Sequence, residues 1–200
     1  METNELETRE LVFKPLGIRL MSGEEISYSV ANQYELLNED FNIYENYLIP
    51  SGEYEWWHQK ISLETKGARN VWGEASYGWG DFYTGQRKDI DLQANWKIAV
   101  PFFIGGNFHQ SKVELPDGTF TANIYQANAN ILFSPTLTLY NYFQYDNATN
   151  SIGWQSRFQW ILKPGNEVIL AWTSNFLEED SKYFMDESAL RLKLKYNIRF

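Results

Sequence analysis

Strict alternation of polar and apolar side chains in residues 89–98 constrains the fold of this chain more than any other feature. One set of alternate positions is apolar and consists of Ile90, Leu92, Ala94, Trp96 and Ile98. The intervening set is polar and consists of Asp89, Asp91, Gln93, Asn95 and Lys97. A period of two puts successive side chains on opposite faces of a β-strand, whereas a helix would mix the two sets around its surface. The segment therefore predicts a strand with one apolar and one polar face.

The same period recurs along the whole chain, and almost no stretch shows a helical period. We predict strands at residues 10–20, 25–36, 54–65, 70–80, 89–100, 103–113, 120–133, 137–145, 152–162, 167–176 and 190–200. The last of them, LRLKLKYNIRF, alternates without exception up to Phe200. The fold class we predict is all-β: an antiparallel up-and-down (meander) β-barrel, or a barrel segment, of about 10–12 strands and of the outer-membrane type.

The predicted connections alternate strictly in length. Five are tight, at 21–24, 65–70, 100–102, 134–136 and 163–166, and five are longer, at 37–53, 80–87, 111–119, 146–151 and 176–188. Outer-membrane barrels alternate in this way between short periplasmic turns and long outer loops. An odd number of strands would put the two chain ends on opposite rims, whereas bacterial barrels normally have an even number. We therefore expect a polar N-terminal segment at 1–9 and, at 10–200, the C-terminal part of a larger barrel.

Composition disfavours several classes of protein. The chain has no cysteine, which rules out disulfides, thiolate metal ligands and a cysteine nucleophile. A net charge of −9 argues against nucleic acid as a partner. A run of about 18 apolar residues, as in a transmembrane helix, is absent, but strands of about 9–11 alternating residues can also cross a membrane.

The N-terminal residues, METNELETRELVF, are acidic and polar, which is not the pattern of a signal peptide. For a protein of the predicted fold, we expect the export signal to lie upstream of this sequence. The expected location is the bacterial outer membrane.

Two features favour contact of the apolar face with lipid rather than with a protein core. The opposite face of the middle strands carries amides and hydroxyls that suit a wet lumen, namely Gln126, Asn128, Asn130, Gln155, Ser156 and Gln159. Aromatic residues make up 17% of the chain, and outer-membrane barrels place such residues in girdles at both membrane interfaces. Four basic side chains are the predicted lumen-lining residues: Arg157, Lys193, Lys195 and Arg199.

Three stretches carry motifs in a recognisable order: WGDFYTG at 79–85, residues 113–170 with FSP, QYDN and PGN, and LRLKLKYNIRF at 190–200. They resemble the C-terminal barrel of a bacterial family, the domain of unknown function 5916. The resemblance covers the chain from about residue 10 to its end. It implies an outer-membrane-type barrel that follows a carbohydrate-binding-module-like domain. It also implies that Tyr196, Ile198 and Phe200 form the signal that the barrel assembly machinery recognises.

Few residues suggest chemistry. His58 and His109 each lie in a predicted strand, and His109 with Ser111 is a pair that a barrel-embedded hydrolase could use. No spacing requires such a pair, so a polar residue of the rim or lumen is the favoured interpretation of each histidine. Asp89 and Asp91 could bind Ca²⁺, but solvated charges are the favoured interpretation. We predict no catalytic residue, cofactor or metal.

The sequence leaves three hypotheses for the function of this chain. The favoured one is an outer-membrane barrel segment that anchors a protein in the membrane and could form a pore, with lipid and the assembly machinery as partners. The alternative is a soluble β-barrel that binds carbohydrate or lipid. The least favoured is a hydrolase that uses His58 or His109. A requirement for detergent separates the first from the second.

Overall fold

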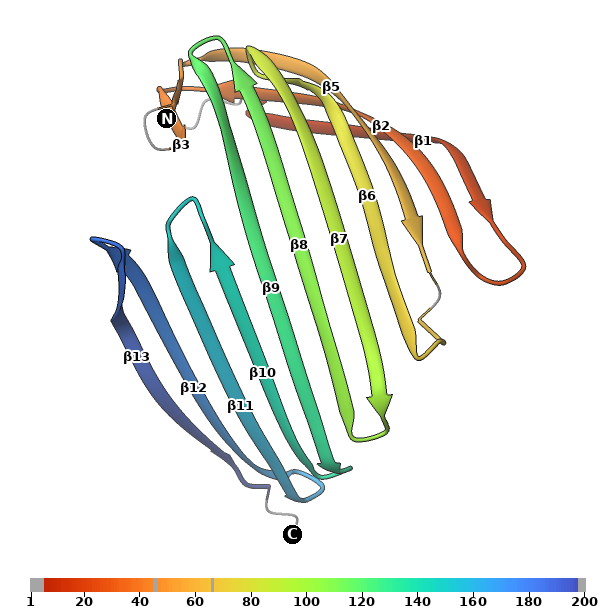
Figure 1. Ribbon diagram of the computed structural model, residues 1–200, viewed down its shortest axis with the longest axis vertical. Helices are drawn as coiled ribbons and strands as arrows, with labels where there is room; N and C mark the ends of the chain where they lie inside the picture. Colours follow the sequence, from red (N-terminus) through yellow and green to blue (C-terminus); the bar gives the residue numbers. More distant parts are fainter. Residues whose placement is uncertain (1–5, 45–46, 66, 198–200) are drawn as a thin grey trace. The chain divides into compact units, whose positions relative to one another are not determined.

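The computed structural model describes residues 6–44, 47–65 and 67–197, and within these ranges the chain forms thirteen β-strands (Figure 1). The strands are β1 (Thr8–Arg19), β2 (Glu25–Leu37), β3 (Phe41–Tyr44), β4 (Tyr47–Ile49), β5 (Gly52–Glu64), β6 (Val71–Phe82), β7 (Gly85–Ala99), β8 (Phe102–Leu115), β9 (Gly118–Ser134), β10 (Leu137–Asp146), β11 (Ser151–Lys163), β12 (Asn166–Glu179) and β13 (Lys182–Lys195). Among the described residues, no helix is long and apolar enough to cross a membrane.

Eleven of the strands form one antiparallel meander, in the order β1-β2-β5-β6-β7-β8-β9-β10-β11-β12-β13, and β3 pairs with β4 in a separate two-stranded sheet. The predicted all-β antiparallel meander is therefore confirmed. Within the described residues, no pairing joins β1 to β13, so the sheet is open at these two strands. Ten of the eleven predicted strand segments each coincide with one strand of this sheet. The last prediction, 190–200, overlaps β13 only in part, because β13 begins at Lys182 and ends at Lys195, and residues 198–200 lie outside the described part of the chain.

The chain divides into two compact units. The first comprises residues 1–66, 73–92 and 109–123, and the second comprises 67–72, 93–108 and 124–200. The long strands β7, β8 and β9 each contribute residues to both units.

The predicted alternation of short and long connections is wrong. Of the five segments predicted to be long, only 37–53 is a long connection. In the other four, the strands extend into the predicted loop, and only residues 83–84, 116–117, 147–150 and 180–181 connect them. The turn between β12 and β13 shows the reason: Asp180 and Ser181 both have positive φ, 51° and 60°. This is the type I′ geometry that closes a two-residue hairpin, and it lets the polar flanking residues continue the two strands.

The long connection between β2 and β5 contains the hairpin β3–β4, which the sequence did not predict. In the first unit, this hairpin packs on a buried cluster formed by Trp56, Phe82, Val113 and Phe120. Tyr44 stacks on Phe120 with ring centroids 4.5 Å apart, and the Tyr47 hydroxyl donates a hydrogen bond to the Thr119 carbonyl at 3.1 Å. The connection is thus a folded element that covers one end of β5, β6, β8 and β9.

Replacement of Phe120 tests this packing. Phe120→Ala should lower the free energy of unfolding by ~3–5 kcal/mol, because a buried ring that contacts Tyr44 and Tyr47 is lost. Phe133→Ala is the matched control, since that ring is 59% exposed, and it should cost much less. Urea unfolding followed by tryptophan fluorescence measures both variants. Equal losses would contradict the packing of the hairpin on Phe120.

Candidate functional site

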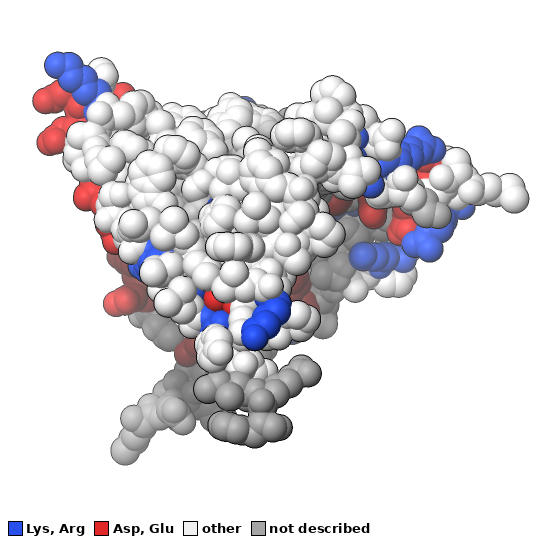
Figure 2. Space-filling model, turned by 90° about the horizontal axis from the view of Figure 1, so that it is seen from below, with Lys and Arg blue, Asp and Glu red and all other residues white. Residues whose placement is uncertain are grey.

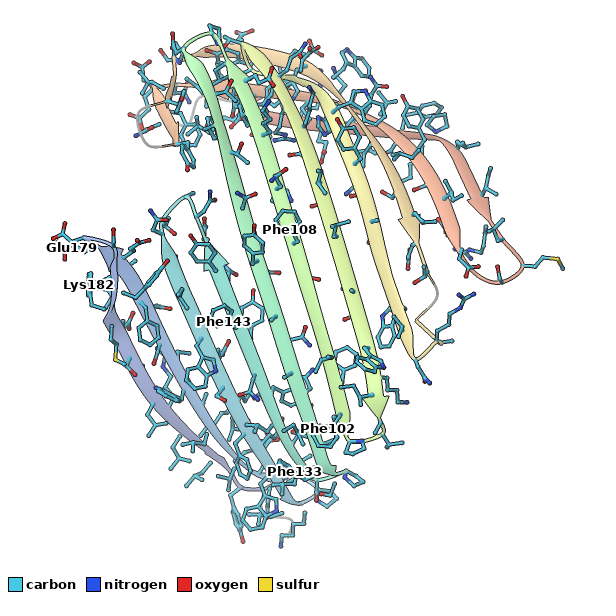
Figure 3. The ribbon with its side chains drawn as sticks, in the orientation of Figure 1. Phe102, Phe108, Phe133, Phe143, Glu179 and Lys182 are labelled. Atoms are coloured by element: carbon cyan, nitrogen blue, oxygen red, sulfur yellow. The ribbon has the colours of Figure 1, made fainter. Side chains whose placement is uncertain are left out.

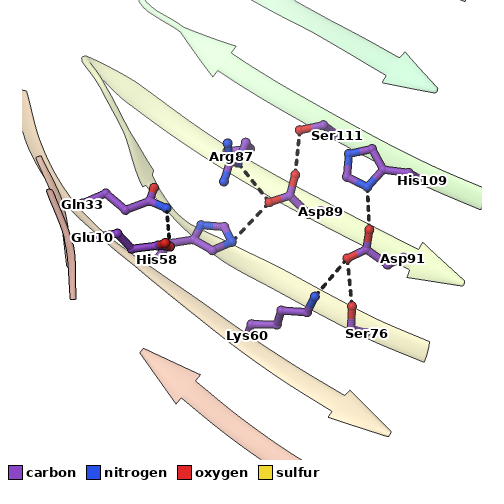
Figure 4. Close-up of polar contacts among 10 residues, drawn as sticks. All are labelled: Glu10, Gln33, His58, Lys60, Ser76, Arg87, Asp89, Asp91, His109 and Ser111. Carbon is purple, nitrogen blue, oxygen red and sulfur yellow. Dashed lines mark hydrogen bonds and ion pairs between the residues drawn. The ribbon is translucent and has the colours of Figure 1, made fainter. Parts of the chain in front are cut away.

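The first unit contains a polar network centred on two aspartates of β7 (Figure 4). Asp89 and Asp91 are two residues apart, so both side chains point to the same face. The Asp89 carboxylate accepts a hydrogen bond from Ser111 Oγ at 2.6 Å and one from Arg87 Nε at 3.0 Å. Its second oxygen also lies 3.2 Å from His58 Nε2. Asp89 is only 8% exposed, so the prediction of a solvated charge is wrong for this residue.

Asp91 repeats the pattern with a different set of partners. Its carboxylate accepts a hydrogen bond from Ser76 Oγ at 2.9 Å and lies 3.4 Å from Lys60 Nζ. His109 Nδ1 is 2.5 Å from its other oxygen. An ionised carboxylate only accepts hydrogen bonds, so we assign a proton to the nitrogen of His109 that faces it. Each aspartate therefore holds one histidine, one serine and one basic side chain, drawn from β5 to β8.

This geometry does not support the hydrolase hypothesis. Ser111 donates to Asp89, and His109 contacts Asp91, so the described contacts include none between Ser111 and an imidazole. Activation of a serine needs such a contact with a base. Among the described residues, no group of three or more His, Cys, Asp or Glu is placed to hold a metal ion. The network instead joins four neighbouring strands through side chains.

Glycines on β6 make room for this network. A Cβ at Gly78 would lie 2.6 Å from His58 Nε2, and one at Gly80 would lie 2.3 Å from the Trp57 carbonyl oxygen. Both distances are shorter than any ordinary contact of a Cβ atom. The two glycines are therefore required for close packing within a strand, which agrees with the usual role of glycine in strand interiors.

The second unit presents a polar face formed by β9, β10 and β11. Cross-strand pairing aligns Asn130, Tyr140 and Arg157 in one row and Asn128, Tyr142 and Gln155 in the next. The two rows line a hollow of about 480 Å³.

The predicted lumen-lining residue Arg157 lies in this hollow. Arg157 is paired with Ala171 of β12. Lys193 and Lys195 are paired with Ile169 and Glu167, which point to the same side of β12 as Ala171. All three basic residues therefore share the polar face. Arg199 lies outside the described residues.

The opposite face of the second unit is apolar and exposed. One cross-strand row of this face consists of Ile131, Leu139, Phe158, Leu170 and Leu192. Leu192 is 63% exposed and Phe133, on the same face, is 59% exposed. Exposure of these side chains to water would raise the free energy of the protein by roughly 25 cal/mol per Å² of apolar surface, relative to an apolar environment.

The few polar side chains on the apolar face bond to one another. Ser156 donates a hydrogen bond to Asn141, which in turn donates to the Ala129 carbonyl at 3.3 Å. Ser156 was predicted for the polar face, and this assignment is wrong, because cross-strand pairing places it beside Asn141 among the apolar residues. Ser188 accepts a hydrogen bond from the Trp172 indole at 2.9 Å and lies 3.0 Å from Ser174 Oγ.

Some aromatic side chains of the second unit lie near the turns, and others lie further along the strands. Figure 3 shows Phe102 and Phe133 near the turns at one end, and Phe108 and Phe143 further along their strands. Tyr125 contacts Phe108, with ring centroids 4.9 Å apart. Tyr125 and Phe133 are ~26 Å apart along β9, and the apolar face of β9 carries Ala127, Ala129 and Ile131 between them. On the neighbouring strands, Phe158 and Trp172 lie in the rows of Ile131 and Ala129.

The predicted assembly signal is described only in part. Tyr196 follows the end of β13 and is 73% exposed. Ile198 and Phe200 lie outside the described residues.

No family model, no curated protein and no solved structure matches this chain.

Substitution of the two aspartates tests whether the more buried carboxylate contributes more to the stability of the fold. Asp89→Asn should lower the free energy of unfolding by ~3 kcal/mol, because Arg87 and His58 lose a buried counter-charge. Asp91→Asn removes the same charge from an equivalent set of partners, but its side chain is 39% exposed against 11% for Asp89. Its cost should therefore stay below ~1 kcal/mol. Urea unfolding measures both, and a larger loss in Asp91→Asn would refute this assignment.

Proposed function

We propose that this chain is a segment of a bacterial outer-membrane β-barrel that acts as a membrane anchor. In this proposal, the apolar face of β9–β13 contacts lipid, and the polar face with Arg157, Lys193 and Lys195 lines an aqueous lumen. Membership of the domain of unknown function 5916 family belongs to the same proposal. The partners are outer-membrane lipid and, through the segment that contains Tyr196, the barrel assembly machinery.

One observation carries the proposal: the apolar face of the second unit is exposed, and the polar side chains on it are bonded within the sheet. Soluble monomers rarely expose a contiguous apolar patch larger than a few hundred Å². A hydrocarbon solvent favours such a face and disfavours any polar group on it that lacks a partner. In the view from below in Figure 2, residues other than Lys, Arg, Asp and Glu cover most of the surface seen.

Two further features support lipid contact. Phe102 and Phe133 lie near the turns, where outer-membrane barrels place one of their two aromatic girdles. On β9, β10 and β11 the polar face carries amides and tyrosines with Arg157 as the charged residue of the hollow, whereas the exterior of a soluble sheet is usually rich in charged residues. A soluble binding module would need another layer over the apolar face.

Quenching by brominated lipid tests the proposed lipid contact. Trp154, Trp160 and Trp172 all lie on the apolar face of the second unit. When the chain is refolded into phosphatidylcholine vesicles, lipids brominated on their acyl chains should quench the tryptophan fluorescence strongly. A cooperatively folded monomer that forms in buffer without detergent, and that is not quenched, would refute the membrane proposal.

A charge placed on each face provides a matched comparison. Leu170→Arg puts a cation on the apolar face and should destabilise the inserted chain by ~2–4 kcal/mol. Thr173→Arg puts the same cation on the polar face of the same strand, where water is available, and should cost less than ~1 kcal/mol. Urea unfolding in vesicles measures both. Similar losses at the two positions would show that the faces do not differ in solvent.

A further inference from the structure

The polar hollow of the second unit offers hydrogen-bonding groups that the protein itself does not use. The side chains of Asn128, Asn130, Tyr140 and Gln155 make no hydrogen bond or ion pair with another described residue. They lie in two adjacent cross-strand rows, so a regular backbone fixes their spacing. A rigid sheet that holds such groups ready loses little freedom when a ligand binds.

The chemistry of the hollow is almost neutral. Arg157 is the one charged side chain among its lining residues, and its guanidinium makes a single long contact, 3.4 Å, with the Gln159 side chain. An amide both donates and accepts hydrogen bonds, and a guanidinium offers five donors. Hydroxyl groups also donate and accept, so they match this set of side chains better than a phosphate or a carboxylate would.

Two tyrosine rings provide the apolar part of the same surface. Tyr140 and Tyr142 stand on one face of β10, ~7 Å apart along the strand, and both are partly exposed. A tyrosine ring offers apolar surface for a ligand to cover. The Tyr142 hydroxyl donates a hydrogen bond to Gln144 Oε1 at 2.7 Å, whereas the Tyr140 hydroxyl has no bond to another described residue. Sugars have the same dual character, since their rings carry apolar C–H groups between the hydroxyls.

We infer that the hollow formed by Asn128, Asn130, Tyr140, Tyr142, Gln155 and Arg157 binds a neutral oligosaccharide. The tyrosine rings pack against sugar C–H groups, and the amides and Arg157 bond to hydroxyls. A second hollow lies beside the first and shares Tyr142 and Gln155 with it, so the surface is long enough to accept more than one sugar residue. The inference does not require that the chain crosses a membrane, because it rests on the polar face alone.

Titration calorimetry on the folded full chain tests this inference. The probes are maltohexaose, cellohexaose and chitohexaose, with inorganic phosphate as an anionic comparison. At least one hexasaccharide should bind with a Kd of ~1 mM or lower, and phosphate should not bind. Failure of all three sugars to bind, or binding of phosphate alone, would overturn the inference. Lipid quenching is measured on the same preparation, so a failure of sugar binding is distinguishable from a failure of the membrane proposal.

Variants assign the bound sugar to the hollow. Tyr142→Ala and Gln155→Ala should each weaken binding by about tenfold, the effect of losing one stacking or hydrogen-bonding contact. Tyr145→Ala is the matched control, because Tyr145 lies on the same strand and points to the opposite face. Circular dichroism checks that each variant folds, and Gln155→Ala carries the test if Tyr142→Ala does not fold. Equal weakening in Tyr145→Ala, or none in the hollow variants, would refute the assignment.

Discussion

The register of the antiparallel ladder is the constraint on which the rest of this structure depends. The strands of the second unit alternate two chemically different faces, so a slip of one residue would exchange the faces completely. In the second unit, the pairing of Leu139 with Ile131 on one side and Phe158 on the other keeps three strands in phase, and the same row continues through Leu170 and Leu192 to β12 and β13. The exposed apolar face and the polar hollow are both products of this single phase relation.

In the first unit, side chains reinforce the register that the backbone sets. Asp89 and Asp91 of β7 reach His58 on β5 and His109 on β8, and a slip of β7 would leave the two histidines without their acids. The glycines of β6 contribute through size, since only a residue without a Cβ leaves the space that His58 occupies. The contacts of the two aspartates and the space left by the glycines of β6 therefore favour the same register of the strands.

The sequence predicts the strands well, because alternation is a local property that each segment carries by itself. It predicts the turns poorly: Asp180 and Ser181 look like part of a charged loop, and only their positive φ angles reveal a two-residue hairpin. The partners of Asp89 and Asp91 were not predicted, since together they come from four strands whose relative register cannot be read from one sequence. The one available signal was that polar residues stand two positions apart at 58 and 60, at 89 and 91, and at 109 and 111, so that each pair lies on one face of its strand.

The hydrogen bond between Ser156 and Asn141 on the apolar face also has an evolutionary consequence. Each of these residues is acceptable among apolar neighbours only while the other is present, since a lone polar group there would cost ~1–3 kcal/mol. Loss of one partner is therefore harmful, whereas loss of both in favour of apolar residues is close to neutral. Positions 141 and 156 should accordingly change together in related chains, and their co-variation would record the pairing of β10 with β11 independently of any structure.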